Sequence, residues 1–539
     1  MSERGIQRVL LVAFGLSGGA ALLYEVVWTR ALSLIFGSTV YALSTMLATF
    51  MAGLALGGYI GGRLADRDKN LIFYFGLFEV GIGVFGLMAV PAIYSLPPFY
   101  FKAHKALHLM PEAYFASQFA MSAAIMLIPA TLMGGTFPVV AKRLTRHMEE
   151  MGSKVGRAYS VNTMGAIFGS LSAGFLLVPA LGLKWSSYAA GCVNILTGCA
   201  LILMSKAPMC GKVAATAVLL PFAAYGPVLK AENNYPSANF YLAHRHESIE
   251  AMKEFEGLRV KLIEKDYREG NLRAYAHGDF LMIQQGGKPE GASPGDLIHM
   301  MRLAALPWAA CENPRKVLVI GLGSGMTAAT AALLSDEVCV VEINPGIVEI
   351  VGEYGMPGLT DAVKVFKGDA RKHLLVSEAA YDIITSEPSL PTEAASANLY
   401  TKEFYELAAS RLAPDGVFCQ GVQGWALTKD DLMVCLKTFA SVFDHVYAWK
   451  VPGREVFTLL GSKKPFRFTP EEMAQRMRGC GLIPESQCEA QPMVVIATPE
   501  RAREIAATEG IPLHTDDRPY LEFAMTKNLL LGEHFRKMR

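Results

Sequence analysis

The 539-residue sequence lacks an excess of either charge, because 50 lysines and arginines stand against 49 aspartates and glutamates and leave a net charge of +1. Proteins that bind nucleic acid through its phosphates normally carry a basic excess or patch, so we expect no nucleic-acid partner. The sequence also lacks a CxxC pair, and its nine cysteines are scattered. It therefore contains no zinc signature and no evident disulfide framework, and we expect no metal.

Hydrophobic residues, by contrast, make up 52% of the chain, the mean hydropathy is +0.28, and the excess lies before residue 230. The first six of seven apolar segments have about the 20 residues that a helix needs to cross a bilayer. No small-residue cleavage site follows the first segment, so it is not a cleavable signal peptide. We predict an α-helical membrane bundle of six or seven spans, at Val9–Val27, Tyr41–Gly61, Leu71–Leu96, Ser117–Val140, Ala158–Leu181, Ser186–Met204 and Val213–Leu229.

Arginine and lysine are unevenly divided among the loops between these segments. The alternate loops carry only four of them, Arg30, Lys102, Lys105 and Lys184. The positive-inside rule then predicts a multi-pass protein of the plasma membrane with a cytoplasmic N-terminus. The short seventh segment decides the side of the remaining chain, which lies outside if that segment spans and in the cytoplasm if it does not. The basic loops contain Arg63, Arg67, Lys69, Lys142, Arg143, Arg146, Lys154, Arg157, Lys206 and Lys212.

Two acidic residues, Glu25 and Glu79, fall inside apolar segments. Insertion of an ionisable group at the centre of a membrane span costs about 2.5–3.5 kcal/mol of free energy, and such a group usually faces a partner or a cavity. One interpretation is a cation site within the bundle, and the other is a structural pair, such as Glu25 with Arg30. The loop GGRLADR at Gly61–Arg67 resembles the short basic loop of major-facilitator transporters, and six helices would make half of such a transporter.

The composition divides the chain into five parts. We expect a transmembrane domain at residues 1–230, a polar linker at 231–270, a small β-subdomain at 271–300, a nucleoside-binding domain at 301–525 and a tail at 526–539. Helix-like and strand-like segments alternate from Leu297 to about Leu460, which is typical of a doubly wound parallel α/β sheet, the Rossmann class that methyltransferases use.

Four strand ends carry the candidate binding residues. Gly321, Gly323 and Gly325, with Ser324 between them, form a glycine turn that allows the backbone to approach a ligand at a helix N-terminus. Glu342 ends the next strand, where its carboxylate can accept hydrogen bonds from both hydroxyls of a ribose. Asp369, followed by Ala370, ends the third strand and either contacts the ligand or caps the following helix.

Six motifs in order resemble the spermidine/spermine synthase family, specifically its membrane-fused bacterial branch. The resemblance covers Gly270 to about Phe523 and implies an S-adenosyl donor, with the adenine amino group held by Asp369. Supply of such donors favours the cytoplasm for the soluble domain. The motifs are KVLVIGLGSG at Lys316–Gly325, VVEINP at Val340–Pro345, GDA at Gly368–Ala370, IITSEP at Ile383–Pro388, LYTKEFYELAASRLAPDGVFCQG at Leu399–Gly421 and HTDDRPYLEF at His514–Phe523.

The fourth strand end departs from the family pattern. Aminopropyltransferases resemble one another in an Asp-x-x-Asp-Pro stretch that binds the aminopropyl arm and helps to deprotonate the attacking amine, and the matching positions here are Ile384 and Glu387. The family's glycine turn also carries an acid where this chain has Ser324. A turn without that acid is closer to the one that methyltransferases use for intact S-adenosylmethionine. Glu387 is therefore the candidate general base or amine anchor, with a turn cap as its structural alternative.

The family pattern suggests further pocket residues. Tyr400, Gln420 and Trp425 are expected in loops over the crevice, where the aromatic rings could stack on the substrate or serve only for packing. Glu290 and Asp296 fall in the segment that the family closes over its substrate. The pair Asp516–Asp517 is expected to be structural, through Arg518.

Three hypotheses follow from these patterns. The first is a membrane-anchored, spermidine-synthase-like transferase that moves an aminopropyl or related alkyl group to an amine or polyamine from an S-adenosyl donor, either S-adenosylmethionine or decarboxylated S-adenosylmethionine. The second is methyl or aminocarboxypropyl transfer from intact S-adenosylmethionine. The third is a transporter-like or sensor protein whose bundle acts on a cation or lipid and whose soluble domain only binds a nucleoside. The sequence leaves open whether the chain forms a homo-oligomer.

Overall fold

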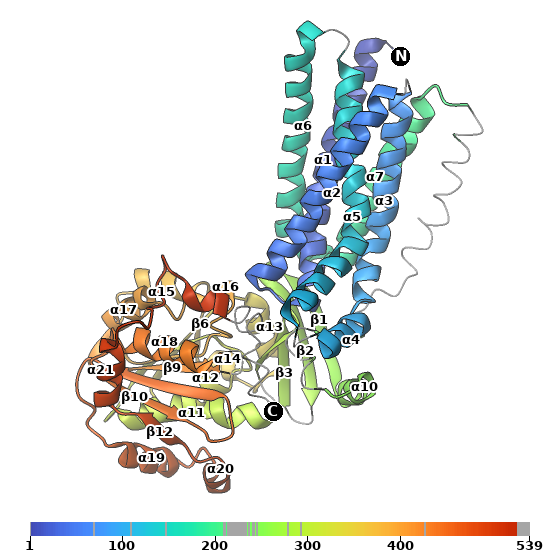
Figure 1. Cartoon of the computed structure of the whole chain (residues 1–539). Coiled ribbons are helices and arrows are strands. Elements are labelled where there is room, and N and C mark those ends of the chain that lie inside the picture. Colours follow the sequence, from blue (N-terminus) through green and yellow to red (C-terminus); the bar gives the residue numbers. More distant parts are fainter. Residues whose placement is uncertain are drawn as a thin grey trace.

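The computed structural model describes residues 2–67, 70–107, 110–145, 148–208, 246–277, 280–291, 294–424 and 427–524, together with residues 212, 234, 235, 238, 239 and 243. It consists of an N-terminal bundle of long helices that stands against a C-terminal α/β domain (Figure 1). A small antiparallel sheet lies between the two. Trp425 and the predicted seventh span at 213–229 lie outside the described residues.

Five of the first six predicted spans fall within helical structure, and the third, Leu71–Leu96, extends two residues past the end of its helix at Tyr94. Within the described part of the chain, five helical stretches are long and apolar enough to cross a membrane, and the fifth, Met151–Met204, contains two of the predicted spans. They separate at Gly182, where the backbone has a φ of 77°. The elements are α1 Glu3–Phe36, α2 Val40–Arg67, α3 Leu71–Tyr94, α4 Pro97–Leu107, α5 Pro111–Leu144, η1 Met148–Glu150, α6 Met151–Ser172, η2 Ala173–Leu177 and α7 Val178–Met204.

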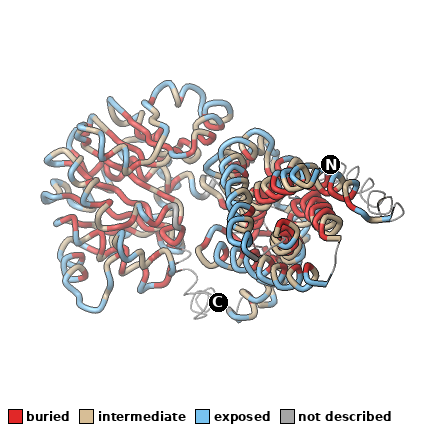
Figure 2. The backbone as a smooth tube through the Cα atoms, turned by 90° about the horizontal axis from the view of Figure 1, so that it is seen from above, coloured by how far each residue is buried: buried red, intermediate tan, exposed pale blue. Residues whose placement is uncertain are grey.

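Glycines bring the bundle helices into close contact. A Cβ at Gly57 of α2 would overlap the carbonyl oxygen of Thr131 in α5, and one at Gly165 of α6 would overlap that of Gly15 in α1. Small residues permit such approach where lipid provides no hydrophobic force between helices. Seen from above, buried residues face the interior of the bundle and exposed ones face outward (Figure 2). Many of the outward residues are large and apolar, including Leu16, Leu47, Leu56, Ile60, Ile128, Phe168 and Leu196.

The two acidic residues of the bundle differ in their surroundings. Glu79 is fully buried, and its Oε2 accepts a hydrogen bond of 2.6 Å from Nδ2 of Asn194. The hydroxyl of Tyr24 donates to Oδ1 of Asn194 at 3.1 Å, so Glu79 belongs to a buried polar network. The suggested pairing of Glu25 with Arg30 is wrong, because the Arg30 guanidinium donates to the carbonyls of Tyr267 and Arg268 in the small sheet at 3.0 and 2.5 Å.

The small sheet has four antiparallel strands in the order β1-β2-β3-β4. They are β1 Val260–Tyr267, β2 Gly270–His277, β3 Phe280–Gln285 and β4 Lys288–Gly291, preceded by α10 Ile249–Gly257. The sheet thus begins inside the range 231–270 that we expected to be a linker. The polar, charged alternation of VKLIEKDY on β1 explains the difference, because this strand is only partly buried and carries no continuous apolar run.

The main sheet has eight strands in the order β12-β10-β11-β9-β8-β5-β6-β7, and β5 to β9 are parallel, as predicted. The strands β10, β11 and β12 are antiparallel and form one edge. The strands are β5 Lys316–Ile320, β6 Glu337–Glu342, β7 Lys364–Lys367, β8 Tyr381–Ser386, β9 Leu412–Gln423, β10 His445–Lys450, β11 Val456–Ser462 and β12 Val494–Ala497.

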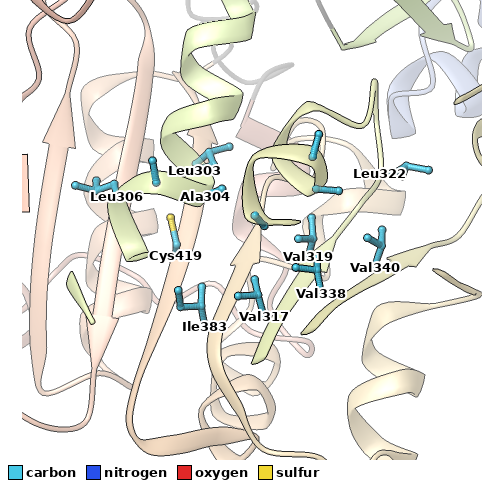
Figure 3. Close-up of a cluster of buried hydrophobic side chains, with 14 of the residues drawn as sticks. Leu303, Ala304, Leu306, Val317, Val319, Leu322, Val338, Val340, Ile383 and Cys419 are labelled. Atoms are coloured by element: carbon cyan, nitrogen blue, oxygen red, sulfur yellow. The ribbon is translucent and has the colours of Figure 1, made fainter. Parts of the chain in front are cut away.

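Helices cover the main sheet and bury its continuous β-branched runs. Leu303, Ala304 and Leu306 of α11 lie over Val317, Val319, Ile383 and Cys419 of the strands (Figure 3). Runs buried on both faces are typical of parallel sheets. The helices are α11 Pro294–Ala310, α12 Met326–Leu334, α13 Pro345–Tyr354, α14 Leu359–Ala362, α15 Ala370–Val376, α16 Ala394–Ala397, α17 Lys402–Ser410, α18 Lys429–Ala440, α19 Pro470–Gly479, α20 Glu485–Ala490, α21 Pro499–Ala507 and η6 Tyr520–Phe523.

Candidate active site

A cavity of about 400 Å³ lies at the carboxyl ends of β5, β6 and β8, and the small sheet and the bundle complete its walls. In the main sheet, β6 and β7 lie on one side of β5, whereas β8 and β9 lie on the other side. The strand order therefore reverses between β5 and β8. Open α/β sheets bind ligands at such a point, and the volume is within the range of small-molecule sites.

The glycine turn after β5 has the backbone that its sequence predicts. Gly321, Gly323 and Gly325 have φ values of 88°, 52° and 88°, which side chains other than glycine rarely adopt. Gly325 precedes α12 as its N-cap residue. Ser324 lines the cavity, and its hydroxyl contacts Sδ of Met300 at 3.5 Å. The turn thus lines the cavity with backbone groups and a neutral side chain.

Glu342, at the end of β6, is almost completely buried and lines the cavity. Its two carboxylate oxygens accept hydrogen bonds of 2.8 Å from the backbone N–H groups of Leu322 and Asn344. Burial raises the pKa of Glu342 above its usual value, and these two donors oppose the increase. Each carboxylate oxygen has a second lone pair, so Glu342 is able to accept further hydrogen bonds from ligand hydroxyls.

Asp369 caps the following helix, as one of the two interpretations predicted, and it also lines the cavity. Its Oδ1 accepts a hydrogen bond of 2.8 Å from the backbone N–H of Lys372, which makes it the N-cap of α15. Asp369 and Ala370 also line the cavity. Capping uses one oxygen, so the other oxygen is available to a ligand.

Glu387 follows β8 and lines the cavity, and its Oε1 lies 2.9 Å from Nε2 of His299. His299 belongs to α11, which is 88 residues earlier in the chain. Gly421 of β9 provides space for Glu387, because a Cβ there would come within 2.9 Å of its Cγ. His299 was not predicted, since no motif surrounds it and only the packing of α11 over the sheet brings it to β8.

A buried cluster of charges forms part of the cavity wall near the glycine turn, where a Cβ at Gly323 would come within 3.1 Å of the carbonyl oxygen of Glu290. Nζ of Lys288 lies 3.0 Å from Oε1 of Glu290 and 2.7 Å from Oε2 of Glu393. Burial raises the pKa of Glu290, with a further increase from Glu393 and an opposing effect of Lys288. Ser389 donates a hydrogen bond to the other oxygen of Glu290. Glu290 was predicted from the family pattern, whereas Lys288 and Glu393 were not.

Acidic side chains outnumber basic ones along the cavity. Arg30 and Lys288 are the basic residues among the described lining residues. Such an imbalance gives the cavity a negative potential, which attracts cationic ligands. The acidic lining residues are Asp266, Glu269, Glu290, Glu342, Asp369, Glu387 and Glu393.

Comparison with known proteins identifies the family. Residues 297–457 match the spermine/spermidine synthase domain. The chain is 21% identical over 482 residues to polyamine aminopropyltransferase 2 of Aquifex aeolicus, which covers 87% of this chain and 91% of the relative. It is 24% identical over 433 residues to polyamine aminopropyltransferase 1 of Streptomyces coelicolor, with 77% and 75% covered. Residues 297–457 therefore form a spermine/spermidine synthase domain, and the chain is similar to polyamine aminopropyltransferases over most of its length.

The match to the spermine/spermidine synthase domain classes the chain with transferases of the aminopropyltransferase type. An alignment over 87% of the chain extends beyond the C-terminal domain, so the similarity to the Aquifex relative includes part of the helical bundle. Among solved structures, the spermidine synthase of Thermotoga maritima matches with a TM-score of 0.35 and 16% identity, over 43% of this chain and 87% of that chain.

The remaining residues suggested by the spermidine synthase pattern lie apart from the cavity. Gln420 is a buried residue of strand β9 and not of a loop, and its Nε2 donates to the carbonyls of Ser386 and Gly421. Tyr400 is also buried and donates to the carbonyls of Pro388 and Gly421. The two side chains therefore hold the backbone on either side of Glu387 in place. Asp296 lies in the first turn of α11 and is exposed.

The acidic pair near the C-terminus has a different partner from the one expected. Oδ1 and Oδ2 of Asp516 accept hydrogen bonds of 2.8 and 2.6 Å from the Arg371 guanidinium, so the ion pair runs to Arg371 and not to Arg518. Arg371 belongs to α15, directly after Ala370. The C-terminal segment is thereby attached to the helix that begins at the cavity.

Residues of the bundle complete the cavity. Arg30, Ser33, Leu34 and Ser38, at the end of α1 and just after it, line the cavity together with Leu183 of α7. The backbone N–H of Leu183 donates to Oδ2 of Asp266 at 3.1 Å, which fixes α7 against β1. Sequence analysis missed the role of these residues because they lie just beyond the predicted apolar spans, where no binding motif is recognisable.

Proposed function

We propose that the protein transfers an aminopropyl or related alkyl group from an S-adenosyl donor to an amine. The observation that carries this proposal is the placement of two carboxylates along one cavity. Glu342 lies beside the glycine turn, where a nucleoside would bind, and Glu387 ends the neighbouring strand across the switch point. Asp369 and Ala370 would border the adenine, and the turn residues Gly321–Gly325 would face the donor chain.

The reaction needs little help with its leaving group. The attacking amine nitrogen forms a bond to the methylene carbon of the sulfonium, the carbon–sulfur bond breaks, and the bonding pair leaves with a neutral thioether. The amine must be unprotonated to attack, and we propose that Glu387 accepts its proton. His299 would hold the Glu387 carboxylate in one orientation through their 2.9 Å contact. Positioning of the two reactants supplies the rest of the acceleration.

The acceptor that this cavity favours is a cationic amine, such as a diamine or polyamine. Seven acidic residues line the cavity against two basic ones, and Asp266 and Glu269 lie at the end that the bundle closes. A second ammonium group of the acceptor could be attracted there, while Leu34 and Leu183 would contact its methylene chain. The relatives named above are polyamine aminopropyltransferases, which agrees with this class of acceptor.

A second candidate is transfer from intact S-adenosylmethionine, and two observations favour it. The turn residue Ser324 is neutral where the family pattern has an acid, so it would not repel the carboxylate of the intact donor. The buried ammonium of Lys288 lies in the same cavity and would attract that carboxylate. Ile384 is weaker evidence for transfer from the intact donor than Ser324, because its side chain is buried in the core of the sheet.

We further propose that the bundle spans the plasma membrane. Its helices are long enough, and many of its large apolar residues are exposed. A soluble protein rarely exposes apolar patches of this extent, whereas lipid tails would cover them.

Calorimetric titration of the detergent-purified full chain with each donor, followed by a turnover assay with a diamine, tests the proposal. We expect tighter binding of decarboxylated S-adenosylmethionine and release of the thioether nucleoside when diamine is added. Tighter binding of the intact donor would instead favour methyl or aminocarboxypropyl transfer. Binding without turnover of either donor would contradict the enzymatic proposal and support a sensor.

A further inference from the structure

The two ends of the helical bundle carry very different numbers of basic residues. Arg30, Lys102, Lys105 and Lys184 belong to the end formed by the last turns of α1 and α3, by α4 and by the start of the second part of α7. The other end, formed by the N-termini of α1 and α6 and the C-termini of α2, α5 and α7, is richer in basic residues. Its described basic residues are Arg4, Arg8, Arg63, Arg67, Lys142, Arg143, Lys154, Arg157, Lys206 and Lys212.

Contacts between helices confirm that these groups belong to single ends. At the basic end, Arg143 of α5 pairs with Glu3 of α1 at 2.9 Å, and Lys142 pairs with Asp66 of α2 at 3.1 Å. At 1.5 Å per residue, Arg4 and Arg30 are about 39 Å apart along α1. This exceeds the roughly 30 Å hydrocarbon thickness of a bilayer, so the two ends would emerge on opposite sides.

The α/β domain contacts the less basic end of the bundle (Figure 1). Arg30 donates to the carbonyls of Tyr267 and Arg268 on the small sheet, and Leu183 donates to Asp266. A Cβ at Gly287 would come within 2.9 Å of the carbonyl oxygen of Leu34, so the turn between β3 and β4 lies directly against α1. The cavity is built into this contact, which means that the placement of the domain is part of the site.

The path of the chain is consistent with this placement. Met204 ends α7 at the basic end, whereas Asn239 donates a hydrogen bond to the carbonyl of Gly287, at the end that contacts the soluble domain. The chain between these two described residues therefore joins opposite ends of the bundle. It includes the apolar sequence at 213–229, which lies outside the described residues.

We infer that the α/β domain and its cavity lie on the non-cytoplasmic side of the membrane. Basic loops are retained in the cytoplasm during insertion, which orients the basic end inward and the opposite end outward. The inference rests on the bundle spanning the membrane, as proposed above, and it reverses the cytoplasmic placement that donor supply alone favours. The S-adenosyl donor and the amine must then reach the outer side, so a transport or export reaction has to supply the donor.

Cysteine labelling of the full chain in spheroplasts of a bacterial host tests this inference. Leu333→Cys places a thiol on an exposed position of α12, and Ser153→Cys places one on an exposed position near the start of α6, at the basic end. The background replaces the half-buried Cys192, Cys199, Cys480 and Cys488, and also Cys210, by serine, so that the native thiols that remain are buried. We expect a membrane-impermeant maleimide to label Leu333→Cys in intact spheroplasts and Ser153→Cys only after permeabilisation.

The opposite labelling pattern, or protection of both thiols until permeabilisation, would overturn the inference. Leu375→Cys, on the exposed face of α15, provides a second position in the soluble domain if the first variant does not fold. Recovery of the chain in the soluble fraction would contradict the membrane span itself, and this result is distinct from a reversed pattern. Neither measurement depends on whether the protein is catalytically active.

Discussion

Replacement of Glu387 by glutamine tests the proposed chemistry most directly. The amide has nearly the same shape as the carboxylate and is able to keep a hydrogen bond to Nε2 of His299. In the unaltered protein this nitrogen lies 2.9 Å from Oε1 of Glu387. It also fits the space that Gly421 leaves beside the side chain. The substitution therefore removes the negative charge and the basicity of Glu387 and changes little else in the cavity.

The expected loss follows from the role of a general base. A positioned base contributes about 10²–10⁴-fold to the rate, and each tenfold step corresponds to about 1.36 kcal/mol of activation free energy. We therefore expect Glu387→Gln to lower kcat by about 10²–10⁴-fold. The dissociation constant of the donor should change little, because the nucleoside would bind at Glu342 and the glycine turn.

The assay combines steady-state release of the thioether nucleoside with calorimetric donor binding. Glu378→Gln is the matched control, because Glu378 is an exposed carboxylate shortly before the same strand β8 and does not line the cavity. Unchanged turnover in Glu387→Gln would refute the assignment of Glu387 as the base. A fall in donor affinity that accounts for the entire loss would refute it as well, since Glu387 would then serve binding alone.

Further predictions concern the neighbours of Glu387, the nucleoside end and the bundle. His299→Ala should lower kcat by about 10–100-fold with little effect on KM, because a hydrogen bond to a charged group contributes about 1.5–3 kcal/mol, whereas His445→Ala, away from the cavity, should change neither constant. Donor affinity should fall as the pH is lowered, and the fall should begin at a pH above the usual pKa of a glutamic acid, because the pKa of Glu342 is raised. Only the ionised carboxylate has acceptors on both oxygens. Donor binding to Glu342→Gln should not show this dependence on pH. Gly57→Ala should destabilise the bundle in a thermal unfolding assay, because its Cβ would overlap the Thr131 carbonyl, whereas Gly58→Ala, with open space around its Cβ, should not.

The parts of this structure that were predictable from the sequence are those with local signals. Apolar runs identified the bundle, and the glycine turn and the acidic strand end at Glu342 identified the cavity. Each depends on residues close in the chain, where length, periodicity and turn chemistry determine the conformation. The topological rule for parallel sheets then placed Glu387 at the same edge without any tertiary information.

The parts that were not predictable depend on packing between distant segments. His299 reaches Glu387 only because α11 lies across the sheet, and Arg30 bonds the small sheet rather than the nearby Glu25. The first strand of the small sheet was missed because β1 is half-buried and highly charged. Gln420 was expected in a loop by match to the family pattern, whereas it lies within β9, which extends to Gln423.

The contact between the two halves also gives a structural reason for their fusion. Ser33 and Leu34 of α1 form part of the cavity wall, and Arg30 and Leu183 fix the bundle to the β-sheet that carries Lys288 and Glu290. The end of the cavity that we propose for the acceptor is therefore complete only when bundle and α/β domain are together. A bundle that served only as an anchor would need no contact of this kind, since a flexible linker would suffice. On these proposals, the fused chain would carry out its reaction directly at one membrane surface.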